Sequence, residues 1–136
     1  TQLYYPTGLA FDASSNSLYI LNYYGHTVVR WILGASAWTV VVGVPGSSSN
    51  TPLQLSIPQD FIFDHMGNLY VADHNNHRIQ LFVPGSLNGI TIAGVTSFPG
   101  SAANQLWYPY SVALDSDLNL YVADLSNNRV QKFLRY

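Results

Sequence analysis

Short apolar runs separated by polar turns follow one another along the whole chain. The runs Leu69–Asp73 and Leu120–Asp124 are typical, with about five residues each and flanking turns rich in Asn, Gly, Ser and Asp. Such runs, joined by short polar turns, are typical of an antiparallel meander of strands. No segment shows a sustained apolar period of 3.6 residues, so no long helix is expected.

The pattern of runs and turns repeats about every fifty residues. Each copy begins at a proline (Pro6, Pro58 or Pro109) that follows a linker containing a Gln-Leu pair. The strands predicted in the three copies are 8–12, 18–22, 28–32 and 39–43; then 60–64, 69–73, 78–83 and 90–94; then 111–115, 120–124 and 129–134. The third copy therefore lacks a fourth strand.

A radial repeat of four-stranded units is typical of β-propeller blades. The run 69–72 does not alternate between apolar and polar residues, so both faces of its sheet are expected to be buried between neighbouring blades. A β-sandwich does not need such a repeat, and a β-solenoid usually has a shorter one. The predicted fold class is all-β, an incomplete propeller of about three four-stranded antiparallel blades whose last blade lacks its outer strand.

The chain 1–136 is expected to be a single partial propeller domain with blades at about 6–52, 58–103 and 109–136. Because known propellers have roughly four to eight blades, three blades are not expected to close a ring. Each end then exposes an apolar blade face, which marks an interface. The expected occupants are the remaining blades of a longer chain or a second copy, and the missing strand favours the longer chain.

The motif within each copy is most complete in the second. Between Pro58 and Phe82, an apolar strand ends in Asp and is followed by a Gly-Asn turn, Leu-Tyr-Val-Ala-Asp and Asn-x-Arg-Ile. The third copy has Leu118 in place of the glycine, and in the first copy Asn22 and Thr27 replace the Asp and the Arg. This motif resembles the NHL repeat, and the resemblance covers almost the whole chain. It implies a propeller of the NHL type that binds partners on one face, although one fold hosts many activities.

Composition narrows the function classes. Only 9% of the residues are charged, the net charge is −2, and the five basic residues form no cluster, so nucleic-acid binding is disfavoured. The chain has no cysteine and no apolar run long enough for a membrane span. No signal peptide is recognisable at Thr1, and the compartment stays open, with an extracellular location slightly favoured.

Several repeated polar residues admit both a structural and a functional role. Asp73 with Arg78, and Asp124 with Arg129, flank a hairpin loop and are predicted to brace it rather than to form a ring of ligand contacts. Asp12, Asp64 and Asp115 end the innermost strands. They are predicted to cap the following turns, with a cation site in the central channel as the alternative.

No catalytic motif or metal-ligand set is recognisable. A zinc site needs three or four converging ligands, so the four histidines are expected to be solvated loop residues, and no cofactor or metal is predicted. The chain is therefore expected to be a non-catalytic scaffold that binds a protein or peptide. The alternatives are a fragment of a metal-dependent propeller enzyme similar to the amidating lyases and, less favoured, a module that binds single-stranded RNA.

The binding surface is expected on the loops between the second and third strands, together with the linkers. The residues predicted to form it are Tyr23, Tyr24, His26, His74, Asn75, His77, Ser126 and Asn127. Phe98 is expected to add to this surface from a linker, and Trp107 is a further candidate for which burial is favoured. Aromatic and Asn-rich surfaces suit protein contacts. The aromatic residues beside the prolines, Tyr4, Tyr5, Trp107 and Tyr108, are expected to be mainly buried between blades.

Overall fold

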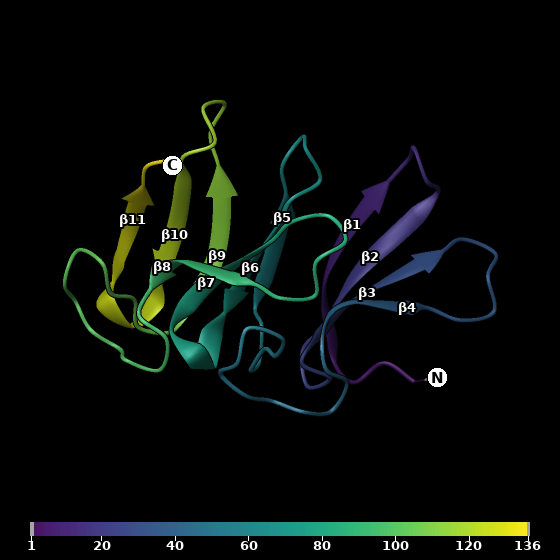
Figure 1. Ribbon diagram of the computed structural model, residues 1–136, viewed down its shortest axis with the longest axis horizontal. Coiled ribbons are helices and arrows are strands. Elements are labelled where there is room, and N and C mark those ends of the chain that lie inside the picture. The colour runs from purple at the N-terminus through teal and green to yellow at the C-terminus, as the bar shows by residue number, and fades with distance from the viewer. Residues whose placement is uncertain (1, 136) are drawn as a thin grey trace.

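The computed structural model describes residues 2–135, which form three antiparallel sheets (Figure 1). The first sheet contains β1 (Pro6–Asp12), β2 (Ser17–Asn22), β3 (Thr27–Ile32) and β4 (Thr39–Gly43). The second contains β5 (Asp60–Phe63), β6 (Leu69–Asp73), β7 (Arg78–Phe82) and β8 (Ile90–Gly94). The third contains β9 (Pro109–Leu114), β10 (Leu120–Asp124) and β11 (Arg129–Phe133).

Each sheet is a meander in chain order, and the strands β1, β5 and β9 are the inner strands of neighbouring sheets. The prediction of an unclosed all-β propeller, with four, four and three strands in its blades, is confirmed. The inner strands β1 and β9 begin earlier than expected, at their prolines. Two three-residue 3-10 helices, η1 (His74–Asn76) and η2 (Leu125–Asn127), were not predicted because a single turn leaves no periodic pattern.

The core consists of two apolar clusters, one in each gap between blades. Val71 of β6 lies in the cluster shared with the first blade, whereas Tyr70 and Ala72 lie in the cluster shared with the third blade. Successive residues of a strand point to opposite faces of its sheet, so a strand in the middle of the central blade needs apolar residues on both faces. This explains why the run of β6 does not alternate.

The linkers contribute a leucine to each cluster. Leu55 and Leu106, from the repeated Gln-Leu pairs, are both 0% exposed. The prediction that the aromatic residues beside the prolines are buried is wrong: Tyr5 is 64% exposed and Trp107 is 43% exposed, and Tyr4 and Tyr108 are also exposed. The leucine of each linker occupies the space between blades, so the aromatic residues that follow it remain at the surface.

A buried ion pair holds the linker between the first two blades. The Asp73 carboxylate accepts hydrogen bonds from Arg78 Nε (2.7 Å) and from the Ser56 amide (2.7 Å). The guanidinium of Arg78 also donates to the linker carbonyls of Asn50 (2.9 Å), Thr51 (2.9 Å) and Gln54 (3.1 Å). We call this arrangement of an acid, an arginine and the linker backbone the linker clamp.

The clamp recurs in the third blade. Asp124 accepts from Arg129 Nε (2.8 Å) and from the Trp107 amide (2.7 Å). Arg129 in turn donates to the carbonyls of Ser101 (2.7 Å), Ala102 (3.1 Å) and Gln105 (2.9 Å). The two clamps hold both linkers in the same way relative to their blades.

The first blade has a neutral version of the clamp. Asn22 Oδ1 accepts the Tyr4 amide (2.6 Å), and Asn22 Nδ2 donates to Thr27 Oγ1 (3.3 Å). Asn22 and Thr27 correspond to Asp73 and Arg78, so both members of the ion pair are replaced together. The amide bond to the linker is kept, whereas the bonds from the guanidinium have no counterpart among residues 2–135.

The buried linker leucines are expected to stabilise the fold strongly. Leu55→Ala should lower the free energy of unfolding by about 2–5 kcal/mol, because it leaves a cavity between the first two blades. Urea denaturation followed by circular dichroism measures the change. The matched control is Leu53→Ala, on the same linker and 44% exposed, which should stay within about 0.5 kcal/mol of wild type. Equal losses in the two variants would contradict the assignment.

The neutral pair of the first blade provides a test of the linker clamp. Arg78→Thr alone should cost about 3–5 kcal/mol, because the Asp73 carboxylate, 0% exposed, is left without its cation. Adding Asp73→Asn should recover part of this loss, since the pair then matches Asn22 and Thr27. Urea denaturation of the two variants measures the difference. Arg129→Thr is the control with a smaller expected loss, because the Arg129 side chain is 30% exposed. If the double variant is no more stable than Arg78→Thr, the unpaired charge of Asp73 does not cause the loss of stability.

Candidate functional site

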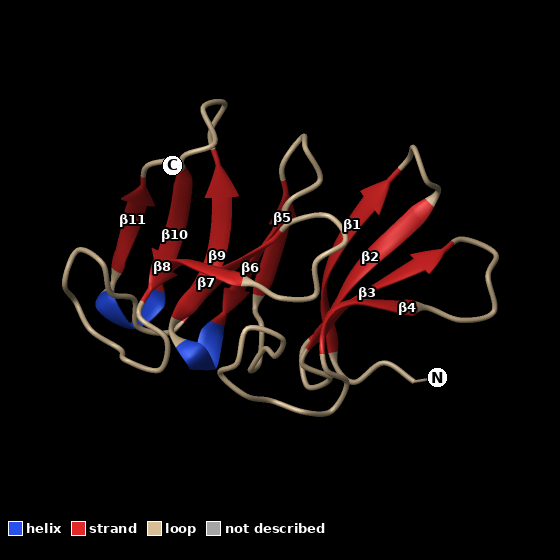
Figure 2. Ribbon diagram, in the orientation of Figure 1, coloured by secondary structure: helices blue, strands red, loops and turns tan. Residues whose placement is uncertain are grey.

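The loops between the second and third strands lie with the linkers at one end of the blades. In each blade, one amide of this loop donates to a linker carbonyl; for example, the Asn75 amide donates to the Ser56 carbonyl (3.2 Å) and the Ser126 amide to the Trp107 carbonyl (3.1 Å). Both 3-10 helices lie along this lower edge of the molecule, opposite the hairpin turns that follow the inner strands (Figure 2). We call this end the loop face.

Equivalent positions of the loop face carry different exposed side chains. The Tyr24 amide donates to the Tyr4 carbonyl (3.1 Å), so Tyr24 corresponds to Asn75 and Ser126. Tyr24 is 47% exposed, and Asn75 and Ser126 are exposed as well. The backbone at this position is therefore held alike in every blade, while the side chain offered to solvent changes.

Four tyrosines of the first blade form an aromatic cluster on the loop face. The ring of Tyr24 lies 4.7 Å from Tyr23, 5.4 Å from Tyr5 and 6.0 Å from Tyr4, measured between centroids. Tyr23 is half-buried by these contacts, whereas Tyr24 remains open to solvent. Of the two tyrosines predicted to contact a partner, Tyr24 has the more accessible ring.

Three of the predicted surface histidines are engaged within the protein. His26 Nδ1 accepts the Ile57 amide (3.1 Å), and His77 Nδ1 accepts the Tyr108 amide (3.2 Å). His74 Nδ1 lies 3.0 Å from the carbonyl oxygen of Pro109. His77 is only 7% exposed, so the expectation of solvated histidines is wrong for this residue. His65, in contrast, is exposed as expected.

The surroundings favour the neutral form of these histidines. Burial lowers the pKa of His26. It also lowers the pKa of His77, with repulsion from His74 as a further cause. For His74, burial lowers the pKa, and the hydrogen bond to the Pro109 carbonyl opposes that shift.

Asn127 is also engaged in a repeated contact. Its Nδ2 donates to the Gly100 carbonyl (2.8 Å) and to Asp124 Oδ2 (2.8 Å). Asn76 makes the same pair of contacts, with Ser49 and Asp73, in the second blade. Sequence reasoning took Asn127 as a contact residue, although its correspondence with Asn76 in the repeat signals a place in the linker clamp.

The aspartates that follow the inner strands cap hairpin turns at the opposite end. Asp64 Oδ1 accepts the amides of Met66 (2.9 Å) and Asn68 (2.9 Å), and Asp115 accepts the equivalent amides in the third blade. Hydrogen bonds from Ser14 and Ser15 lower the pKa of Asp12 to about 2. Among residues 2–135, no three acidic or histidine side chains come together in a way that could hold a metal ion.

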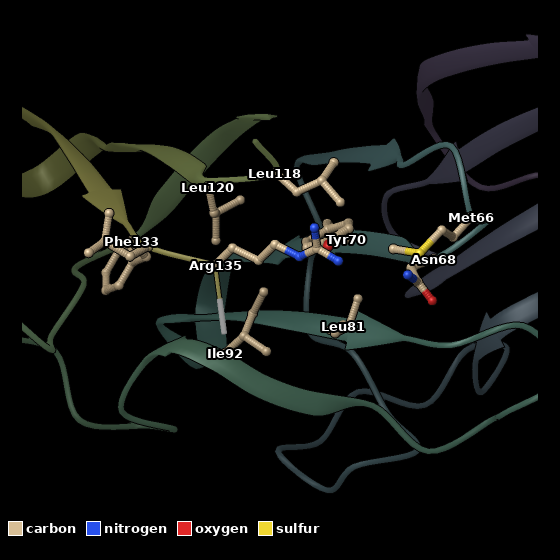
Figure 3. Close-up of a pocket in the computed structure, with 10 residues that line it drawn as sticks. Met66, Asn68, Tyr70, Leu81, Ile92, Leu118, Leu120, Phe133 and Arg135 are labelled. Carbon is tan, nitrogen blue, oxygen red and sulfur yellow. The ribbon is translucent and has the colours of Figure 1, made fainter. Parts of the chain in front are cut away.

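A cavity of about 210 Å³ lies between the second and third blades (Figure 3). Its lining is mainly apolar, from Leu81, Ile92 and Leu120 among others, and the Arg135 side chain extends across it toward Tyr70. The Tyr70 hydroxyl donates to Asp64 (3.3 Å), and desolvation raises its pKa. The residues that line this cavity offer no nucleophile paired with a base, so it is a weaker candidate site than the loop face.

Within residues 2–135, no helix has the length and apolar character that crossing a membrane requires. The loop face is the best candidate site because it combines a fixed backbone with several exposed aromatic rings and with equivalent positions that carry different side chains.

Comparison with solved structures places this fold among larger propellers. The chain superposes on an auxiliary nutrient binding protein from Bacteroides ovatus with a TM-score of 0.74 at 18% identity, over 91% of this chain and 36% of that one. It also matches a chain of a nidogen/laminin complex (TM-score 0.66, 20% identity, 96% and 43% coverage). A third match is virginiamycin B lyase from Staphylococcus aureus (TM-score 0.65, 14% identity, 96% and 38% coverage). Identities this low show a shared fold alone.

Sequence comparison identifies the repeat. The family model described as NHL repeat matches residues 55–82 and 106–133. NHL repeat-containing protein 3 from Homo sapiens is 32% identical over 120 residues, and its Mus musculus counterpart is 29% identical over 116 residues. These matches cover 82% and 81% of this chain, which spans about a third (32%) of the length of each relative. The chain is therefore built from NHL repeats and belongs to the NHL-repeat family of β-propeller proteins.

Proposed function

We propose that this chain is part of a non-catalytic scaffold that binds a protein or peptide segment on its loop face. The observation that carries the proposal is the equivalence of Tyr24, Asn75 and Ser126. The backbone at all three is tied to a linker, while the side chains differ and face solvent. Because the backbone is fixed and each blade presents a different side chain there, the loop face is suited to contacting successive residues of an extended peptide.

The chemistry of the loop face fits a peptide better than a small charged molecule. Tyr24, Trp107 and Tyr110 are all more than 40% exposed, and large aromatic rings supply much of the binding energy at protein interfaces. Neither of the two linkers contains a charged residue, so the face has little to offer a highly charged ligand. The likeness to a chain from a nidogen/laminin complex supports a protein partner by analogy of fold.

A lyase activity is the second candidate, and it rests on the likeness to virginiamycin B lyase. That likeness concerns the fold, and the residues that line the loop face supply no paired acid and base. Elemental analysis of the full-length protein after purification without added metal separates the candidates. A stoichiometric metal ion would favour the lyase over the scaffold.

Selection of peptides on the full-length protein tests the proposed surface. A phage-displayed peptide library panned on the protein should yield binders whose Kd rises about tenfold on Tyr24→Ala, because loss of an exposed interface aromatic typically costs 1–2 kcal/mol. Isothermal titration calorimetry with the selected peptide measures the change.

The matched control is Met66→Ala, because Met66 is 48% exposed but lies on a turn at the opposite end of the blades. Its Kd should equal that of wild type. A selected peptide that is weakened by Met66→Ala and not by Tyr24→Ala would move the binding surface to the other end and refute the assignment.

A further inference from the structure

Two histidines occupy corresponding places in the first and second blades, and each accepts a hydrogen bond from the linker into the next blade. His26 Nδ1 accepts the Ile57 amide, and His77 Nδ1 accepts the Tyr108 amide. The backbone is left-handed at all four residues, with φ of 56° at both histidines, 49° at Ile57 and 54° at Tyr108. A left-handed backbone is uncommon outside glycine, so its recurrence on both sides of both contacts marks a contact built into the repeat.

The direction of these bonds fixes the protonation state of the rings. A backbone amide can only donate, so Nδ1 of His26 and of His77 must carry no proton, and the ring is neutral with its proton on Nε2. A second proton can add only at Nδ1, where it would face the N–H of the linker. Protonation therefore replaces a hydrogen bond by a contact between two donors.

His74 has the opposite requirement and serves as an internal contrast. Its Nδ1 lies beside the carbonyl oxygen of Pro109, which can only accept. His74 Nδ1 therefore carries a proton in both the neutral and the charged ring, and further protonation leaves this contact in place. Of the three histidines that bond to the backbone, protonation thus breaks the contacts of His26 and His77 and leaves the contact of His74 in place.

The groups around His26 and His77 do little to hold an added proton. The linkers 44–59 and 95–108 contain no charged residue, and none of the ion pairs among residues 2–135 includes a histidine. The ring of His77 packs on the Tyr108 phenol at 4.5 Å, and His74 lies nearby as a second base. The closest carboxylate along the chain, Asp73, is neutralised by Arg78.

The inner strands that follow these linkers contribute one further carboxylate. Asp60, on β5, is occupied by the Phe61 amide (2.9 Å), the Ser111 hydroxyl (2.6 Å) and the Val112 amide (3.0 Å). In the first blade, Asn22 and Thr27 stand where the second blade has its ion pair, so the loop of His26 has no charged neighbour there. Among residues 2–135, neither the His26 nor the His77 contact thus has a free carboxylate beside it that would compensate a charged imidazole.

We propose that His26 and His77 are acid-sensitive clasps, and that their protonation releases the linkers and loosens both blade junctions in mildly acidic conditions. This inference does not depend on what the loop face binds. Since the pKa of each ring is lowered in the folded protein, the unfolded chain takes up the protons first. Stability is therefore full above the ordinary histidine pKa of 6.5 and is lost as the pH falls from there through the lowered values.

Asparagine at both positions removes the titration while keeping the acceptor. The third blade already has Asn128 at the corresponding place, with φ of 52°. Asparagine tolerates a left-handed backbone, and its Oδ1 is attached to Cγ as Nδ1 is in histidine. The double variant His26→Asn/His77→Asn thus keeps an acceptor for the Ile57 and Tyr108 amides that is not protonated in mild acid.

Hydrogen exchange of the full-length protein, read by mass spectrometry in peptides that contain Ile57 or Tyr108, tests the proposal. In wild type, the protection factor of these peptides should fall about fivefold or more between about pH 7.5 and about pH 5, the loss expected for one hydrogen bond. In the double variant it should stay constant. His65→Asn, at an exposed histidine, is the matched control and should behave as wild type.

An equal loss of protection in wild type and in the double variant would overturn the proposal. A second measurement needs no variant: the imidazole nitrogen shifts of histidine-labelled wild-type protein at neutral pH report the tautomer of each ring. A proton on Nε2 of His26 and His77 supports the clasps, and a proton on Nδ1 overturns them even if the asparagine variant does not fold.

Discussion

The arrangement of the blades depends on how each linker is held to the blade that it enters. In the second blade, the buried pair of Asp73 and Arg78 joins the linker amide of Ser56 to several linker carbonyls through one charge-neutral unit. Burial raises the pKa of Asp73, and the guanidinium opposes this shift with help from the Ser56 amide. Because a carboxylate and a guanidinium together satisfy so many backbone groups, a loop without regular secondary structure becomes a defined part of the blade.

That constraint also shapes the loop face. Once the linkers and the loops are fixed, side chains such as Tyr24 and Ser126 can change without altering the backbone that presents them. The repeated residues hold the backbone frame, and the variable residues change only the side chains offered to solvent. The polar residues that recur between the blades belong to the frame, and this is why Asn127 and His77 contact neighbouring backbone groups.

The strands could be predicted from the sequence because local pattern determines them. The bounds of β6 and β8 follow directly from their apolar runs and the polar turns beside them. The linker contacts could not be predicted in the same way, because the partners of Arg78 and His77 are backbone groups, which have no side-chain signature. The repeated Gln-Leu pair was the available signal for the buried Leu106; the aromatic neighbours, which also recur beside the prolines, obscured it.

Because the first blade has a neutral pair, its linker is held by a different set of hydrogen bonds from the linkers of the other two blades. The segment ahead of β1 is joined to its blade through Asn22 and the loop backbone. The later linkers are also held by guanidinium groups, each of which donates hydrogen bonds to several carbonyls. Among residues 2–135, the linkers that enter the second and third blades are thus joined to their blades by more hydrogen bonds than residues 2–5 are to the first blade.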